Sequence, residues 1–237
     1  MLLYRVCPGC RSKERGVCRR CLAAVKHAAP IDDLPPLQWA GALFDYDDRV
    51  QRIVLAAKNG GRRDVIVQLG TVAAASFEAS QGPHGGPRCR SVPGGRFDAV
   101  TWVPASSEGV RRRGYDQGRL LAGAVASRLG IPCRRLLLRR RGQAQARRGR
   151  ADRLLGPEIR APRGAPQRVL LVDDVITTGT SLVAAANALR GGGALSVVGL
   201  AIARSTGTAL EQPTADLRRA SGPDFHPRTV PVPVIYG

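Results

Sequence analysis

The segment RVLLVDDVITTGTSLVAAANALR, residues 168–190, limits most strongly what this chain can fold into. Four apolar residues, Val169–Val172, precede two acids and the polar run Thr177–Ser181. After this run, apolar residues recur at helical spacing. The order predicts a buried strand, a polar loop and a helix, which is the repeating unit of an α/β protein.

The polar loop at 173–181 has the composition of an anion site beside a pair of carboxylates. Free backbone N–H groups at a helix start attract phosphate, and Gly179 permits a close approach of the backbone. The hydroxyls of Thr177–Ser181 add further donors. Asp173 and Asp174 would repel a phosphate, so they suit sugar hydroxyls or positive charge developing on a sugar. The loop therefore predicts a sugar-phosphate site; the alternative is a strand whose terminal acids only cap a helix.

The chain's 237 residues are enough for one sizeable core and a small appendage. Hydrophobic residues make up 43% of the chain, which favours a globular protein over a disordered one. No apolar run approaches the roughly 20 residues of a membrane span. Because the N-terminus does not resemble a secretory signal either, we expect a cytoplasmic location.

The net charge of +19 comes from 37 Lys and Arg against 18 Asp and Glu. A charge of this size attracts polyanions such as nucleic acids. It is densest at 134–153, where nine Arg accompany a single acid, Asp152. Codon bias in a GC-rich genome would enrich Arg equally well, so composition leaves both explanations open.

Four of the six cysteines lie in the first 21 residues and form two C-x2-C pairs. They are Cys7, Cys10, Cys18 and Cys21. Two such pairs can hold one Zn²⁺ tetrahedrally, and metal binding would supply the folding free energy of so short a segment. The alternatives are two disulfides, which the cytoplasm disfavours, and a redox motif, which should sit beside a βαβ pattern. Cys89 and Cys133 read as ordinary free thiols.

We expect three parts: a zinc-binding segment with its connector at 1–36, an α/β domain at 37–204 and a loose tail at 205–237. The expected strands are at 37–46, 97–103, around 133–138, 169–172 and 195–203. Helices are expected from residue 48, at 62–80, at 117–129 and after the 173–181 loop, with loops at 81–96 and 105–118. Strands separated by helices predict a parallel sheet covered on both faces.

The string VLLVDDVITTGTS resembles the phosphoribosyl-pyrophosphate (PRPP) binding motif of the type I phosphoribosyltransferases. Four other features resemble one branch of that superfamily, the ComF (competence protein F, amidophosphoribosyltransferase-like) family. They are the C-x2-C pair, FDYDDRVQRIVLAAKNGG, VPASSEGVRRRGYDQGRLLA and a distal stretch with Gln and Arg. Together they span residues 7–204. The resemblance implies a type I phosphoribosyltransferase-like α/β fold, a parallel sheet flanked by helices with a small N-terminal four-cysteine zinc knot.

The resemblance also implies roles for individual residues. Asp173 and Asp174 match the acids that contact the ribose hydroxyls and support the cationic transition state. The 5′-phosphate loop is matched by Thr177, Thr178, Gly179, Thr180 and Ser181. Lys58 lies where the family has a lysine near the active cleft. Candidates for the pyrophosphate end are Arg111, Arg112 and the catalytic candidate Arg113, although a run of charge is often only a solvated loop.

In the superfamily's reaction, pyrophosphate leaves C1 of the ribose and a nucleophile attacks the resulting cation. Mg²⁺ and basic residues stabilise the departing pyrophosphate, while carboxylates stabilise the sugar.

This sequence departs from the family pattern at three places. In the Arg-Gly-aromatic-Asn-Gln motif, Asp116 replaces the Asn. Ala57 replaces the Leu that precedes the family's lysine. In the distal stretch Gln145 and Arg153 fit, but Gly156 stands where Asn is expected. If this stretch binds the acceptor, the acceptor chemistry is altered or lost.

Two functions remain open at this point. The first is Mg²⁺-dependent phosphoribosyl transfer to an unknown acceptor. The second is a catalytically silent PRPP-fold protein that binds single-stranded DNA in DNA uptake, with the zinc knot and 134–153 as its surfaces. No aromatic residue lies in 134–153, so base stacking there is weakly supported.

Overall fold

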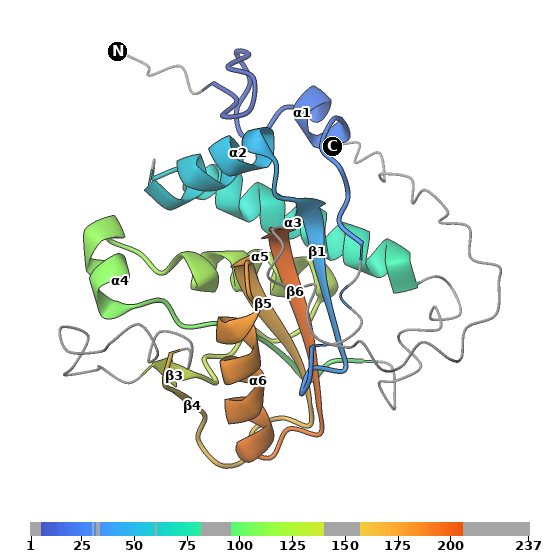
Figure 1. Ribbon diagram of the computed structural model, residues 1–237, viewed down its shortest axis with the longest axis vertical. Coiled ribbons are helices and arrows are strands. Elements are labelled where there is room, and N and C mark those ends of the chain that lie inside the picture. Colours follow the sequence, from blue (N-terminus) through green and yellow to red (C-terminus); the bar gives the residue numbers. More distant parts are fainter. Residues whose placement is uncertain are drawn as a thin grey trace, which may run out of the picture.

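The computed structural model describes residues 6–29, 31, 34–59, 61–81, 96–139 and 157–205. A four-stranded sheet forms its centre, with the strand order β1-β6-β5-β2 (Figure 1). The strands are β1 (Trp39–Asp45), β2 (Ala99–Trp102), β5 (Arg168–Ile176) and β6 (Ser196–Arg204). All three pairings are parallel, so the carboxyl ends of the strands lie at one edge of the sheet.

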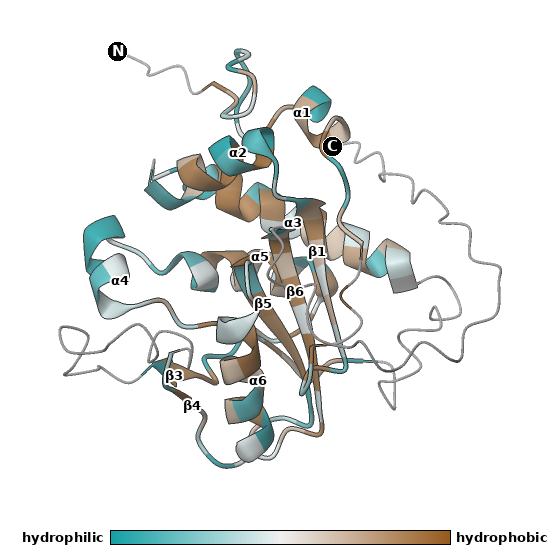
Figure 2. Ribbon diagram, viewed as in Figure 1, coloured by the Kyte–Doolittle hydropathy of each residue, from teal (hydrophilic) through white to brown (hydrophobic). Residues whose placement is uncertain are grey.

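The apolar run Val169–Val172 is buried on both faces of the sheet, as the sequence predicts. Val169 and Leu171 pack in the core on the side of α6 (Thr180–Gly191). Leu170 and Val172 belong to the opposite core, built with α2 (Asp48–Asn59), α3 (Arg63–Gln81) and α5 (Gln117–Leu129). The expected parallel sheet covered on both faces is therefore confirmed, and Figure 2 shows the hydrophobic residues of β5 and β6 between these layers.

The helix expected from residue 48 is α2, and its start is fixed by the side chain of Asp47. The backbone N–H of Val50 donates to Asp47 Oδ1 at 2.7 Å, which satisfies one of the free donors of the first turn. The buried face comprises Val50, Ile53, Val54 and Ala57, the residues that set the helical period in the sequence. Lys58 consequently lies in the last turn, next to the carboxyl edge of the sheet.

The expectation of a loop at 105–118 was wrong, because a short helix, α4 (Ser107–Arg113), forms there. Ser106 Oγ accepts from the N–H of Gly109 at 3.1 Å, and Gly114 ends the helix with a φ of 74°. No residue of α4 is buried. The helix therefore lacks the apolar period on which the sequence reading depended, and only its capping residues could have indicated it.

The two acids lie inside β5 rather than after it. The strand continues to Ile176 because its pairing with β6 continues, with Asp173 opposite Ala201 and Val175 opposite Ala203. The expectation that the strand ends at Val172 was therefore wrong, since ladder pairing rather than apolar composition sets the strand end.

The strand expected around 133–138 is also different. Cys133 makes an isolated parallel bridge to Val100. A second, two-stranded sheet then pairs β3 (Leu138–Arg139) antiparallel with β4 (Ile159–Arg160). A short helix, α1 (Arg19–Ala23), overlaps the second cysteine pair.

Several expectations fall outside the described residues. They concern the loop that contains Cys89, most of the Arg-dense stretch with Gln145, Arg153 and Gly156, and the tail from residue 206 onward. Within the described ranges, none of the helices is both long and apolar enough to cross a membrane.

Candidate functional site

Asp173 and Asp174 occupy the carboxyl-terminal part of β5, where the structure brings them together with Lys58. Lys58 Nζ lies 3.0 Å from Asp174 Oδ2. The backbone N–H of Asp174 donates to Asp173 Oδ1 at 2.8 Å. The side chains of Lys58 and Asp174 are 31% and 25% exposed, so the ion pair is accessible from solvent at the sheet edge.

The carboxyl group of Asp173 has a shifted pKa. Burial, and then repulsion by the charge of Asp174, raise the pKa of Asp173 to about 8. The Asp174 N–H and the nearby Lys58 act in the opposite direction but are outweighed. Asp173 therefore holds a proton at neutral pH and can donate a hydrogen bond, while Asp174 pairs with the Lys58 ammonium. Desolvation and a neighbouring like charge are the usual causes of a raised carboxyl pKa.

The loop after β5 leads into the amino terminus of α6, as the sequence predicts. Gly179 is the N-cap residue, has a φ of 73° and offers no side chain to cap the helix, and the N–H of Thr180 donates to Thr178 Oγ1 at 3.4 Å. The start of a helix whose N-cap has no side chain is a place where an anion can bind. A Cβ at this position would lie 2.9 Å from Leu34 Cδ1. Thr178 and Thr180 place their hydroxyl oxygens 2.7 Å apart. This loop thus combines the glycine, the hydroxyls and the helix start that a phosphate requires.

The predicted arginine cluster lies on α4, which follows β2 at the same edge of the sheet. Arg111 and Arg112 are exposed, whereas Arg113 is half-buried. Arg113 Nε is buried and has no hydrogen-bond partner among the described residues. A buried donor without a partner is costly, which makes Arg113 the member of the cluster best suited to receive an anionic ligand.

Three contacts around the motif RGYDQ had no predicted role. The Tyr115 hydroxyl donates to the Ala57 carbonyl at 2.9 Å, and the Arg63 guanidinium lies 4.8 Å from the centre of the Tyr115 ring. Asp116 Oδ2 accepts from Trp102 Nε1 at 2.9 Å, and Asp116 is the N-cap residue of α5. An acid directly before a helical pattern is a capping signal, so the role of Asp116 as the N-cap of α5 could have been predicted from the sequence. The side chain of Asp116 therefore has a structural function.

The interior beneath the acids is small. A cavity of about 10 Å³ borders Asp174 and Gln117, and the rest of its lining is apolar. It has room for no more than a single water molecule. This cavity is therefore too small for a sugar phosphate.

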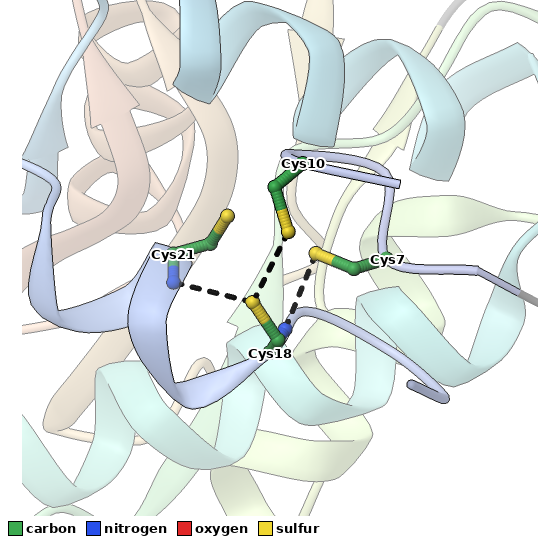
Figure 3. Close-up of side chains that lie close together, drawn as sticks. All are labelled: Cys7, Cys10, Cys18 and Cys21. Carbon is green, nitrogen blue, oxygen red and sulfur yellow. Dashed lines mark hydrogen bonds between the residues drawn. The ribbon is translucent and has the colours of Figure 1, made fainter. Parts of the chain in front are cut away.

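The four N-terminal cysteines form a second candidate site, a metal centre. Their sulfurs point toward one another (Figure 3) and all lie within 4.8 Å of each other. Cys10 Sγ and Cys18 Sγ are 3.5 Å apart, close to the separation of about 3.8 Å in a tetrahedral zinc site with 2.3 Å bonds. Backbone N–H groups donate to the sulfurs of Cys7 and Cys18, each at 3.3 Å. The cluster fits a zinc ion, and none of the described cysteines is in a disulfide.

The thiols of this cluster have unequal acidity. Hydrogen bonding, first with the Ser12 side chain, lowers the pKa of Cys10 to about 6. Burial is the main cause that raises the pKa of Cys21. Cys10 is therefore a thiolate at neutral pH and ready to bind a metal, whereas a buried thiolate at Cys21 needs a cation to compensate its charge.

The cysteine segment is docked on α2 and α3. Gln68 of α3 forms two hydrogen bonds with the Val17 backbone, accepting from its N–H at 2.6 Å and donating to its carbonyl at 2.8 Å. Arg62 donates to the carbonyl of Val6 at 2.9 Å. A Cβ on Gly9 would lie 2.7 Å from the sulfur of Cys21, so a larger residue at this turn would displace that sulfur. The segment is thus part of the core on the α2 and α3 side of the sheet.

Comparison with known proteins gives a partial match. Residues 115–220 match the family model described as a phosphoribosyl transferase domain, a range that contains β5, both acids and the 177–181 loop. No curated protein matches the chain. The matched range does not include Lys58, the α4 arginines or the cysteine segment.

Solved phosphoribosyltransferase structures are similar to the chain at low identity. The glutamine PRPP amidotransferase from B. subtilis, complexed with ADP and GMP, is 22% identical with a TM-score of 0.40; the match covers 62% of this chain and 30% of that chain. The orotate phosphoribosyltransferase from Aeropyrum pernix is 18% identical with a TM-score of 0.33, covering 81% and 93%. The adenine phosphoribosyl transferase from Trypanosoma brucei, in complex with AMP, pyrophosphate and ribose-5-phosphate, is 11% identical with a TM-score of 0.34, covering 84% and 96%. The chain thus matches less than a third of the length of the B. subtilis enzyme.

Proposed function

We propose that this protein is a phosphoribosyltransferase of the ComF type, which binds PRPP with Mg²⁺ and transfers the phosphoribosyl group to an acceptor. One observation carries the proposal. Asp173 and Asp174 stand beside Lys58 at the strand end, directly before a glycine-started helix amino terminus, in a segment that matches a phosphoribosyl transferase domain. The four-cysteine segment and the RGYDQ loop support the ComF type.

Different residues bind the 5′-phosphate, the ribose and the pyrophosphate of PRPP. The 5′-phosphate sits on Thr177–Ser181, held by the N–H groups and the dipole of α6. Asp173 and Asp174 contact the ribose hydroxyls, and the charge on Asp174 stabilises the cationic sugar as its bond to pyrophosphate breaks. Arg113 lies at the same edge and attracts the pyrophosphate.

Mg²⁺ fits this site because carboxylate oxygens and diphosphate oxygens are the hard ligands that it prefers. When bound with PRPP, it neutralises the charge that develops on the leaving pyrophosphate. Lys58 compensates the charge of Asp174 in the free protein. The carboxyl edge of the sheet therefore does not strongly repel an anionic donor.

Calorimetric titration with PRPP and Mg²⁺ tests the donor half of the proposal. We expect saturable binding that weakens at least tenfold in Asp174→Ala, a loss of about 1.4 kcal/mol or more. Glu78→Ala, which removes a half-buried carboxylate on α3 paired with Arg128, is the matched control and should bind normally. Absence of PRPP binding by the unaltered protein would refute the proposal. If PRPP binds, measuring pyrophosphate release in the presence of a panel of bases, amines and ammonia identifies the acceptor.

We also propose that the four-cysteine segment holds a structural zinc ion and that the protein works in the cytoplasm, where its thiols stay reduced.

A second candidate, a catalytically silent protein that binds single-stranded DNA, is favoured by the net charge of +19 and by exposed arginines at 111, 112, 134 and 135. It predicts an affinity for single-stranded DNA that falls steeply with salt. Salt-insensitive or undetectable DNA binding would exclude it.

A further inference from the structure

The end of α2 carries Lys58 and needs support from elsewhere in the chain. The last four carbonyls of a helix have no partner within it, and helix ends fray. The helix stops at Asn59, and Gly61 follows with a φ of 63°. Lysine also loses much side-chain entropy when it is fixed, and a half-exposed ion pair is weak by itself. The Lys58–Asp174 contact therefore depends on what holds the backbone around Lys58.

Tyr115 supplies that support. Its hydroxyl donates to the carbonyl of Ala57, the residue directly before Lys58, at 2.9 Å. This bond satisfies one of the free carbonyls at the end of α2 and ties it to the loop between α4 and α5. The ring is packed against the core on the α2 side of the sheet.

Tyr115 is itself fixed from two sides. The guanidinium of Arg63, the first residue of α3, lies over its ring at 4.8 Å. Its neighbour Asp116 is held by the indole N–H of Trp102 and begins α5. The Tyr115 side chain thus joins the end of α2 to the start of α3, and the next residue in the chain, Asp116, caps α5.

From these contacts, we propose that Tyr115 is a positioning residue that holds Lys58 against Asp174 and so sets the charge of the donor site before PRPP binds. The effect on PRPP binding rests on the proposed function. The contacts of Tyr115 with Ala57 and of Lys58 with Asp174 exist in the free protein. Tyr115 acts through Lys58 and does not touch the donor.

Chemical labelling of lysine tests the contact without PRPP. Lysine occurs at positions 13, 26 and 58 only, so mass spectrometry after brief treatment with an acetylating reagent can follow each amine separately. In Tyr115→Phe we expect Lys58 to react about two- to tenfold faster, the range for the loss of one hydrogen bond. Lys26, paired with Asp45 at 3.2 Å, should react at its normal rate.

Tyr46→Phe is the matched control, because it removes the hydroxyl of another half-buried tyrosine that packs on the same core. It should leave the Lys58 rate unchanged. Should Tyr115→Phe fail to fold, Arg63→Gln removes the cation over the ring and should give a smaller increase. An unchanged Lys58 rate in folded Tyr115→Phe would overturn the inference.

A double-mutant cycle then tests whether Tyr115 acts through Lys58. Tyr115→Phe should weaken PRPP·Mg²⁺ binding about two- to tenfold in the normal background and have no further effect in Lys58→Ala. Additive losses would show that Tyr115 acts by another route and would overturn the inference. If the unaltered protein does not bind PRPP, the proposed function fails, while the labelling result still decides the role of Tyr115.

Discussion

At the scale of single residues, the carboxyl of Asp173 links the site to the stability of the protein. Its pKa in the folded state is about 8, against about 3.9 in an unfolded chain. The folded state therefore favours the protonated form. Its contribution to stability is complete below pH 4 and is lost as the pH rises through 8.

Asp173→Asn removes this pH dependence, because the amide stays neutral. We expect the variant to match the unaltered protein in melting temperature near pH 4 and to exceed it increasingly between pH 5 and pH 8. Thermal melts across this range measure the difference. Glu108→Gln, at an exposed site on α4, serves as control and should show no such trend. A constant difference across the range would contradict the raised pKa.

Gly179 offers a second test at the residue scale. Alanine there must adopt a φ of 73° and place its Cβ 2.9 Å from Leu34. We expect Gly179→Ala to lose about 1–3 kcal/mol of unfolding free energy in urea, the usual cost of a strained backbone position. In the same helix, a Cβ on Gly191 meets nothing within 4 Å. Gly191→Ala should therefore be neutral or more stable by up to about 1 kcal/mol, and equal losses in both variants would argue against the strain.

At the scale of elements, the cysteine segment can be tested through its metal. Cys18→Ser removes a buried ligand, so the purified variant should contain no stoichiometric zinc and should lose the fold of residues 6–23. Cys133→Ser, at an exposed thiol away from the cluster, should keep the zinc. Metal analysis by mass spectrometry measures the zinc content of both variants. An unaltered protein that folds fully without metal would rule out a structural zinc.

The elements also show what the sequence could and could not predict. The apolar pattern located elements that bury one face, as α2 does, or both faces, as β5 does. The loop before α6 also lies where the sequence placed it. α4 was missed because it buries nothing. The contacts of Lys58 with Asp174, and of Tyr115 with Ala57, join segments that are distant in the chain, so no local pattern could predict their geometry. The resemblance implied that Lys58 lies near the active cleft. Its ion-pair partner, Asp174, could be identified only from the folded structure.

At the scale of the whole molecule, the sheet separates two cores. The cysteine segment belongs to the core with α2, α3 and α5, whereas α6 packs on the other. Removal of zinc by a chelator should therefore increase amide hydrogen exchange in residues 48–59 and leave 180–191 protected. Exchange that rises equally in both helices would indicate that the two cores open together.

The place of β1 in the sheet has a consequence for how the chain folds during synthesis. β1 pairs along its length with β6 alone, and its other edge makes only isolated bridges to His27 and Ile31 among the described residues. A nascent chain emerges amino terminus first. β1 therefore stays unpaired until β6 (Ser196–Arg204) has been synthesised. Loss of β6 by truncation would leave β1 as an open edge, a template for aggregation. The last described strand is therefore also the one that closes the fold.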